Sequence, residues 1–186
     1  MTDVYSPNED SLFLLKSVEG VPASRVAEIG IGSGFVLSHY VLNHSPSLAV
    51  GTDVDIGALK VTSRRNGADS IELVQCEACE GFREGAFNLI FFNPPYLRDE
   101  GTQDLATSGG SMGIEVTHFM VRSSLRTLVS KGRMIFIVSS LADMNLLRSR
   151  LRREGVTLRR RGRMRLFFEE LYSMGIVKRG SSRRLR

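Results

Sequence analysis

Hydrophobic positions along this chain fall into two patterns that alternate from one end to the other. Short apolar runs predict buried strands, and they lie at 25–31, 48–55, 70–76, 87–92 and 132–140. Stretches with an apolar residue at every third or fourth position predict helices, and they lie at 6–18, 35–43, 56–67, 113–129 and 142–155. Because strands and helices alternate, the sequence predicts an α/β fold, with a mostly parallel sheet wrapped by helices on both faces.

Local signals refine this picture. Ser6, Pro7 and Glu9 have the spacing of a helix capping box, so the first helix is predicted to begin with Ser6 as its cap. Gly67 is predicted to end the third helix. Residues 157–179 predict strands that return antiparallel instead of another crossover. No repeat or linker interrupts the pattern, so residues 1–186 are predicted to form a single domain.

Composition favours a globular protein of a reducing compartment. Hydrophobic residues make up 42% of the chain and charged residues 24%. No apolar run reaches the roughly 18 to 20 residues that a membrane span needs, and the first residues lack the basic and apolar regions of a signal peptide. Two cysteines make no disulfide framework for this length, so we expect a cytoplasmic protein with no membrane contact.

Arginine is concentrated toward the C-terminal end. Nine arginines lie between Arg148 and Arg165, and residues 178–186 add more. A solvated helix face would explain them, and so would a patch for RNA or for a protein bound on a ribosome. An arginine run alone does not specify nucleic acid, so both interpretations stay open.

A glycine-rich loop follows the first predicted strand, at the edge where parallel sheets bind ligands. Glu28 is followed by Gly30, Gly32 and Gly34, and the loop runs into a helix N-terminus. A dinucleotide-binding loop would place its third glycine one residue later, at Phe35. The observed spacing resembles the first motif of class I S-adenosylmethionine methyltransferases, in which the loop passes under the methionine part of the cofactor. A purely structural turn is the alternative.

Acidic residues follow the next two strands. Asp53 ends the second strand and is predicted to accept hydrogen bonds from a ribose diol, with Asp55 as second choice because it also suits a helix N-cap. Glu77 follows the third strand and is predicted to accept from an adenine amino group. Its neighbours Cys76 and Cys79 have the spacing of half a zinc site or of a redox pair. The chain has no second cysteine pair, so no metal site is predicted.

The fourth strand ends in Asn93-Pro94-Pro95-Tyr96. Pro95 has no N–H and the two rings stiffen the loop, so the Pro94 carbonyl and the Asn93 side-chain oxygen are predicted to stand side by side as acceptors. Two such acceptors can hold a planar NH₂ group while Tyr96 stacks on it. Methyl transfer to nitrogen needs this positioning and stabilisation of the growing positive charge more than it needs a base. A simple turn is the alternative.

This tetrapeptide is similar to the motif of methyltransferases that modify exocyclic or amide nitrogens. Residues 4–15, 51–59 and 109–116 further resemble the HemK-type protein-(glutamine-N5) methyltransferases, in their short archaeal and eukaryotic form. The resemblance implies a Rossmann-like class I methyltransferase fold, with a mostly parallel seven-stranded sheet and an antiparallel C-terminal strand. It also implies methylation of the glutamine in the Gly-Gly-Gln loop of a class I translation release factor. Glu77 departs from the aspartate that the family more often has.

Partners and rival functions follow from the same resemblance. It implies a small zinc-binding activator protein on the sheet edge. The third predicted strand should lie outermost, so Ile71 and Leu73 are the expected contact region. One rival function is methylation of an adenine amino group in DNA or RNA, which the arginines favour. Another is a non-catalytic assembly subunit, against which Asn93 and its prolines argue.

Overall fold

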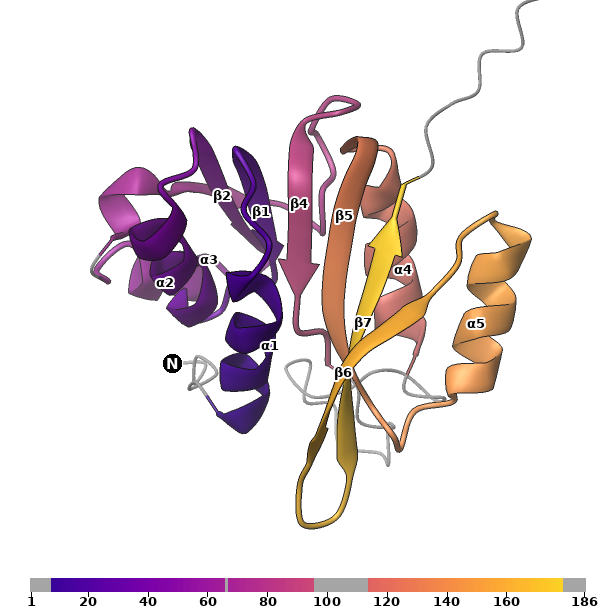
Figure 1. The fold of residues 1–186 in the computed structure, drawn as a ribbon. Helices are drawn as coiled ribbons and strands as arrows, with labels where there is room; N and C mark the ends of the chain where they lie inside the picture. Colours follow the sequence, from indigo (N-terminus) through magenta and orange to yellow (C-terminus); the bar gives the residue numbers. More distant parts are fainter. Residues whose placement is uncertain (1–7, 66, 96–113, 179–186) are drawn as a thin grey trace, which may run out of the picture.

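The computed structural model describes residues 8–65, 67–95 and 114–178. Within these residues one seven-stranded sheet forms the centre of the molecule, with the strand order β3-β2-β1-β4-β5-β7-β6 (Figure 1). Its strands are β1 (Arg25–Ile29), β2 (Leu48–Asp53), β3 (Glu72–Gln75), β4 (Phe87–Phe92), β5 (Leu128–Ser139), β6 (Arg159–Arg165) and β7 (Glu170–Val177). The helices are α1 (Glu9–Glu19), α2 (Phe35–His44), α3 (Ile56–Thr62), the short 3₁₀ helix η1 (Ala68–Ser70), α4 (Glu115–Leu125) and α5 (Met144–Arg153).

The strand directions confirm the predicted mixed sheet. β1 pairs in parallel with β2 and with β4, β2 with β3, and β4 with β5. β7 runs antiparallel to both β5 and β6, so it is the reversed strand among those described. β3 and β6 form the two edges of the sheet. The prediction that the third strand lies outermost is therefore confirmed.

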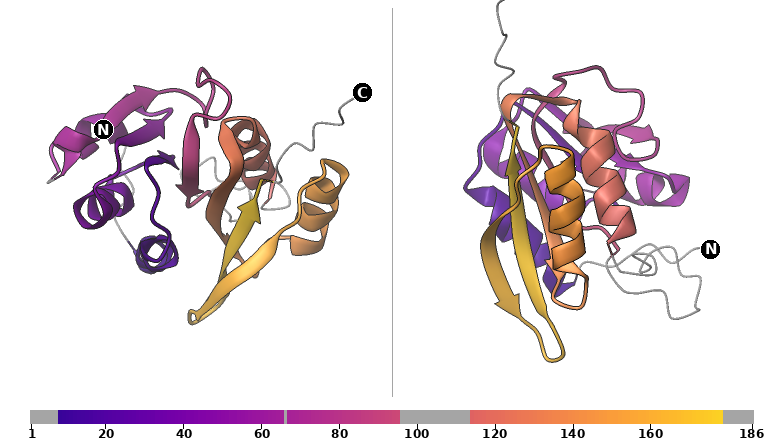
Figure 2. Two further views of the ribbon diagram at one scale, coloured as in Figure 1. Left: turned by 45° about the horizontal axis from the view of Figure 1, so that its top comes forward. Right: turned by 90° about the vertical axis from the view of Figure 1, so that its right-hand side faces the viewer.

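Helices cover both faces of the sheet, as the apolar runs predict (Figure 2). One apolar cluster packs α1, α2 and α3 against one face, with Leu14, Leu37 and Leu59 among its members. A second cluster packs α4 and α5 against the other face, with Val121 and Leu147 among its members. β4 lies between the two clusters, which is why its residues are apolar on both sides without alternation.

The boundaries of three helices differ from the prediction. The expected Ser6 cap is wrong, because Asn8 is extended and the first helical residue is Glu9. The third helix ends at Thr62, well before Gly67, which instead precedes η1. The fourth helix ends at Leu125, so residues 128 and 129 belong to β5. Only after the fourth helix does the apolar spacing continue past the real boundary; at the other two the capping signals mislead.

The apolar side chains of the β3 region point inward. Ile71 is buried in the cluster that includes α2 and α3, and Leu73 packs partly buried against the same cluster. Cys76 N–H donates to the Asp53 carbonyl of β2 at 3.1 Å. Since alternate residues of a strand direct their backbone groups to opposite sides, Leu73 and Gln75 present theirs to the outer side of the sheet. Unpaired backbone groups, more than apolar side chains, thus characterise this edge.

Candidate functional site

The strand register brings the predicted site residues to one edge of the sheet. Ile29 lies opposite Thr52 on one side and opposite Phe92 on the other. Gly30, Asp53 and Asn93 therefore come next on three neighbouring strands, with Gly30 in the middle. From the strand spacing, the Asp53 and Asn93 backbones are about 10 Å apart. This is the carboxyl edge of the parallel strands, where the sequence places its candidate chemistry.

The glycine loop, residues 30–34, is held from both sides. Ile31 N–H donates to the Thr52 carbonyl at 2.9 Å. From α3, Thr62 Oγ1 donates to the Gly32 carbonyl at 3.0 Å. Beyond that helix, Arg65 Nε donates to the Ser33 carbonyl at 2.7 Å. These bonds are internal to the protein and fix the loop from both sides, as a preorganised binding site requires.

The surroundings of Gly34 explain why the third glycine of the loop lies at this position, one residue earlier than in a dinucleotide-binding loop. Its φ of +70° is one that other residues rarely adopt, and a Cβ there would lie 2.4 Å from Thr62 Cγ2 and 2.8 Å from Thr62 Oγ1. Gly32 has a φ of +54°, but a Cβ there would meet nothing within 4 Å. The loop thus packs closely against α3 at Gly34 and leaves open space beside Gly32.

Glu28 is a buried carboxyl at the base of the loop. It lies on β1 and is 4% exposed. Leu37 N–H, in the first turn of α2, donates to Glu28 Oε2 at 2.9 Å. Burial raises the pKa of Glu28 well above its ordinary value of 4.5, while the Leu37 hydrogen bond and the more distant Arg65 charge act in the opposite direction. The side chain ties the first strand to the helix after the loop.

Asp53 connects the loop to the second strand. Its Oδ2 accepts from Gly32 N–H at 3.0 Å, and its Oδ1 accepts from Asp55 N–H at 3.0 Å. Each carboxylate oxygen can accept two hydrogen bonds, so the group retains capacity for a ribose diol. Asp55 caps α3, because its Oδ1 accepts from Gly57 N–H at 2.7 Å. The alternative role that the sequence offers for Asp55, a helix N-cap, is thus the one that the structure shows.

Asn93 is held by a carboxylate from the first helix. Its Nδ2 donates to Asp10 Oδ2 at 2.9 Å. A carboxylate has only acceptor atoms, so the amide must turn its NH₂ toward Asp10 and its oxygen away. Asn93 Oδ1 is buried and has no hydrogen-bond partner among the described residues. Buried acceptors are rarely left unpaired, so this atom is a candidate for contact with a bound substrate.

The remaining predicted residues lie near this arrangement or outside the described part of the chain. Pro94 is buried and Pro95 is partly buried, directly after Asn93. Glu77 is exposed in the turn after β3, on the far side of Asp53 from Asn93. Tyr96 lies outside the described residues, so its stacking role stays a prediction.

The described residues contain no metal-binding group. Cys76 is partly buried and Cys79 is fully buried, and both are free thiols. Burial raises the pKa of both thiols, which opposes the thiolate form that binds zinc. No cluster of three or more histidine, cysteine or acidic side chains in the described ranges could hold an ion.

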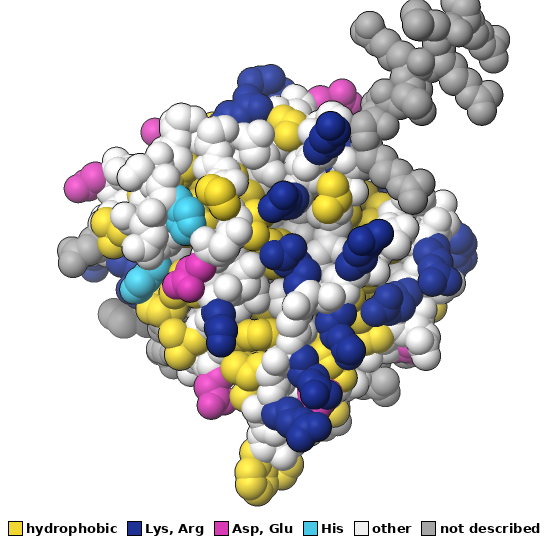
Figure 3. All heavy atoms as spheres, in the orientation of Figure 1, with side chains coloured by type: hydrophobic (Ala, Val, Ile, Leu, Met, Phe, Trp, Pro, Cys, Tyr) yellow, Lys and Arg dark blue, Asp and Glu magenta, His cyan; other side chains and the backbone are white. Residues whose placement is uncertain are grey.

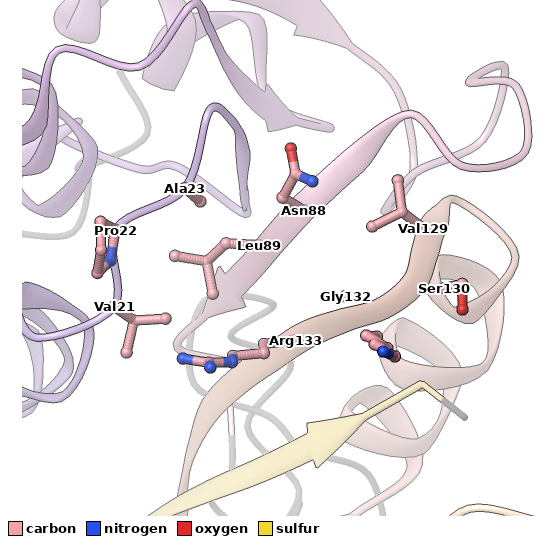
Figure 4. Close-up of a pocket in the computed structure, with 10 residues that line it drawn as sticks. Val21, Pro22, Ala23, Asn88, Leu89, Val129, Ser130, Gly132 and Arg133 are labelled. Atoms are coloured by element: carbon pink, nitrogen blue, oxygen red, sulfur yellow. The ribbon is translucent and has the colours of Figure 1, made fainter. Parts of the chain in front are cut away.

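A depression at the opposite end of the parallel strands does not belong to this site. It lies between the segment before β1 and the first residues of β4 and β5, with Pro22, Asn88 and Arg133 in its wall (Figure 4). These are the amino ends of the parallel strands, whereas Asn93 follows the carboxyl end of β4. Within the described ranges, no helix is long and apolar enough to cross a membrane.

Comparison with known families agrees with this geometry. The model of the methyltransferase small domain matches residues 4–161, which is most of the chain and includes all the site residues named above. The chain belongs to the methyltransferase small domain family. The HemK-type resemblance seen in the sequence is confirmed by its relatives within that family.

Two curated relatives cover different shares of this methyltransferase. A protein of Methanocaldococcus jannaschii, named as a candidate protein N5-glutamine methyltransferase, is 29% identical over 177 residues, which cover 91% of this chain and 89% of that protein. The release factor glutamine methyltransferase of Bradyrhizobium diazoefficiens is 29% identical over 149 residues, which cover 72% of this chain and 50% of that longer protein. This chain thus has the length of the archaeal relative.

A solved structure supports the fold of this methyltransferase at full length. A chain of the E. cuniculi Mtq2–Trm112 complex, described as responsible for the methylation of the eRF1 translation termination factor, superposes with a TM-score of 0.77. It is 25% identical, and the match covers 95% of this chain and 99% of that chain. The predicted class I methyltransferase fold is therefore confirmed.

Asp10 is the site residue of this methyltransferase that sequence reasoning missed. It is 6% exposed near the start of α1, and the segment around it was singled out only because residues 4–15 resemble the family. An acidic residue in the first turn of a helix ordinarily favours the helix dipole, which hides any other role. Only the fold shows that Asp10 reaches Asn93.

Proposed function

We propose that this protein transfers a methyl group from S-adenosylmethionine to the side-chain amide nitrogen of a protein glutamine, in the Gly-Gly-Gln loop of a class I translation release factor. One observation carries the proposal: Asn93 Oδ1 is buried with no hydrogen-bond partner among the described residues, and Asp10 fixes the direction in which it points. This atom suits an N–H donor such as a primary amide. The names of the relatives, several of which are glutamine methyltransferases, support the same acceptor.

The glycine loop and Asp53, which follow β1 and β2 beside Asn93, fit the cofactor. We assign the methionine part to the open space beside Gly32, in the loop of Gly30, Gly32 and Gly34 that hydrogen bonds hold in place. Asp53 retains acceptor capacity for the ribose hydroxyls. Val54 is 65% exposed beside it and offers an apolar contact for the adenine, with Glu77 as the acceptor for the adenine amino group. The cofactor, when bound, supplies an electrophilic sulfonium methyl group.

The chain's own residues position the acceptor nitrogen. Asn93 Oδ1 accepts one N–H of the glutamine amide, and the Pro94 carbonyl, as predicted, accepts the other. Both oxygens would then stabilise the positive charge that develops on nitrogen as its bond to the methyl carbon forms and the bond from that carbon to sulfur breaks, with S-adenosylhomocysteine as the leaving group. The nitrogen loses a proton after alkylation, so no strong base is required. Asp10 keeps the Asn93 oxygen facing the substrate throughout.

The test is a methylation assay with labelled S-adenosylmethionine and a purified class I release factor, in the presence of an activator of the Trm112 type. Label should enter the release factor, and changing its Gly-Gly-Gln glutamine to asparagine should abolish incorporation. The Asn93→Ala variant should lose about 10²- to 10³-fold in rate while binding S-adenosylhomocysteine normally. Incorporation that persists without the glutamine would overturn the assignment of the acceptor.

A second candidate function is methylation of an adenine amino group in DNA or RNA. The arginine-rich β6 favours it, because all five of its arginines are exposed to solvent. The same Asn93 acceptor would suit the exocyclic NH₂ of adenine. DNA and RNA oligomers in the labelled assay distinguish the two functions, since only the second predicts incorporation into them.

The outer edge of β3 is the surface that we propose for the activator. Among the described residues, β3 pairs only with β2, so the backbone groups of Leu73 and Gln75 are available on its other side. A partner strand added there would extend the sheet by β-augmentation. The E. cuniculi relative was solved as a two-protein complex, which supports the proposal of a small partner, and the HemK-type resemblance suggests that this partner binds zinc.

A further inference from the structure

The turn between β6 and β7 exposes two large aromatic side chains. Phe167 is 92% exposed and Phe168 is 87% exposed, and their rings meet edge to face with centroids 4.7 Å apart. Leu166 N–H donates to the Glu169 carbonyl at 2.8 Å and closes the turn. Tight turns are usually made by glycine, asparagine, aspartate, proline or serine. The fold therefore gains nothing from phenylalanine at these two positions. We call residues 166–169 the hairpin tip.

The hairpin tip lies beyond the same end of the sheet as Asn93, where the parallel strands have their carboxyl ends. Leu171 of β7 pairs with Ser139, the last residue of β5, and Ser140 N–H donates to the Glu170 carbonyl at 2.7 Å. β5 is the neighbour of β4, so β7 lies two strand spacings, about 10 Å, from the strand that ends at Asn93. The hairpin projects beyond the sheet in the direction in which β4 runs (Figure 1). A macromolecule that places one group at Asn93 would extend over this tip.

The charges around the hairpin indicate the chemistry of its partner. Lys and Arg side chains follow the hairpin down to an apolar tip (Figure 3). Glu170 pairs with Arg163 at 3.7 Å and with Arg165 at 3.1 Å, whereas the other three arginines of β6 have no ion pair among the described residues. The strand therefore attracts acidic groups.

The residues next to the rings favour a protein over a nucleic acid. Glu169 directly follows Phe168 and has no ion pair among the described residues, so a phosphate backbone that stacked its bases on the rings would pass beside its carboxylate. A protein can instead present an apolar depression to the rings and place its acidic side chains farther along β6, beside Arg159 and Arg160, away from Glu169. Phenylalanine and arginine are also enriched in protein interfaces.

We propose that the hairpin tip is a docking point for the protein substrate. Phe167 and Phe168 enter an apolar depression of the substrate, the unpaired arginines farther along β6 contact acidic side chains of the same protein, and the glutamine is thereby held within reach of Asn93. This inference rests on the proposed function, because it requires a folded protein as the acceptor. The hairpin tip would then help to select which protein is methylated, although none of its atoms takes part in the methyl transfer.

The experiment compares the double variant Phe167→Ser/Phe168→Ser with the wild-type enzyme, each with its activator, on folded release factor and on a short peptide containing Gly-Gly-Gln. The KM for the folded release factor should rise about 10- to 100-fold, with little change in kcat. Peptide methylation and binding of S-adenosylhomocysteine should be unchanged. Val177→Ser is the matched control. Val177 is 59% exposed at the end of β7 farthest from the hairpin tip, so this substitution should leave KM, kcat and cofactor-product binding unchanged.

Three outcomes would overturn the proposal. One is an unchanged KM for the folded release factor, and another is an equal loss on protein and peptide. The third is a fall in RNA binding, measured by fluorescence anisotropy, with protein methylation intact, which would assign the tip to nucleic acid. Failure of the wild-type enzyme to methylate any release factor would instead contradict the proposed function itself.

Discussion

Asp10 and Asn93 are 83 positions apart, and the hydrogen bond of 2.9 Å between them determines which atom of the amide would face the proposed substrate. Removing the Asp10 carboxylate would allow the Asn93 amide to rotate and present its NH₂ instead. A donor in that place would repel the N–H of an incoming amide. In the proposed mechanism, Asp10 thus acts on the reaction through Asn93 and is a positioning residue.

The Asp10→Asn variant should therefore lose about 10- to 100-fold in kcat, because the catalytic acceptor is no longer held in one orientation. Binding of S-adenosylhomocysteine, measured by calorimetry, should stay normal. Glu9→Gln is the control, since Glu9 is the exposed acidic neighbour in the same helical turn. A normal kcat in Asp10→Asn would show that Asn93 needs no help from α1.

Glu28 predicts a pH dependence of stability. Burial raises its pKa above 4.5, so the folded protein keeps this proton to a higher pH than the unfolded chain does. Folding then takes up a proton in this range, and the stability that Glu28 contributes at low pH is lost as the pH rises. In Glu28→Gln the Leu37 N–H retains an acceptor but the titration is gone. As the pH rises above 4.5, the free energy of unfolding of the wild-type protein should therefore fall relative to that of the variant. Parallel urea-unfolding curves across this range would contradict the prediction.

At the scale of elements, the glycine loop and α3 behave as one unit. Gly34→Ala combines an unfavourable φ with a clash against Thr62, which is itself fully buried, so rotation of that side chain gives no relief. Gly32→Ala has the same kind of φ but open space around the new methyl group. Both variants should lose about 1 to 2 kcal/mol from the left-handed backbone, and Gly34→Ala should lose clearly more.

Urea unfolding of the two variants measures this difference directly. Gly32→Ala has a second expected effect, because its methyl group enters the space assigned to the cofactor: it should weaken binding of S-adenosylhomocysteine more than it weakens the fold. Equal destabilisation by the two substitutions would show that the contact between Gly34 and α3 is not tight in solution.

The sequence predicts strands better than it predicts the ends of helices. β4 matches its predicted bounds because a strand buried on both faces is a nearly continuous apolar run, here bounded by Gly85 and Ala86 before it and by Asn93 after it. The boundary between α4 and β5 was missed because Leu125, Leu128 and Val129 continue an apolar pattern that suits both elements, with no glycine or proline between them. The Asp10–Asn93 contact has no local signal at all, since it depends on how α1 packs beside β4.

At the scale of the whole molecule, the two edges of the sheet have different roles in our proposals: β3 receives the activator and the hairpin of β6 receives the substrate.

The β3 edge can be tested through its backbone. Gln75→Pro removes an outward N–H from an edge strand, where proline is tolerated, while Gln75→Ala removes only the side chain and its bond to the Val54 carbonyl. Co-purification with a co-expressed activator should fail for the proline variant and persist for the alanine variant, with similar melting temperatures. Full recovery of the complex with Gln75→Pro would place the activator elsewhere.

The strand order also constrains how a newly made chain reaches this structure. β7 is the last strand of the described sequence, yet it lies between β5 and β6, and within the described residues it is the only partner of β6. During synthesis, the arginine-rich β6 must therefore wait outside the sheet, and the edge of β5 stays open, until the residues of β7 have emerged. Ribosomes that stall before this point would hold a chain that has its glycine loop and Asn93 but an unfinished sheet.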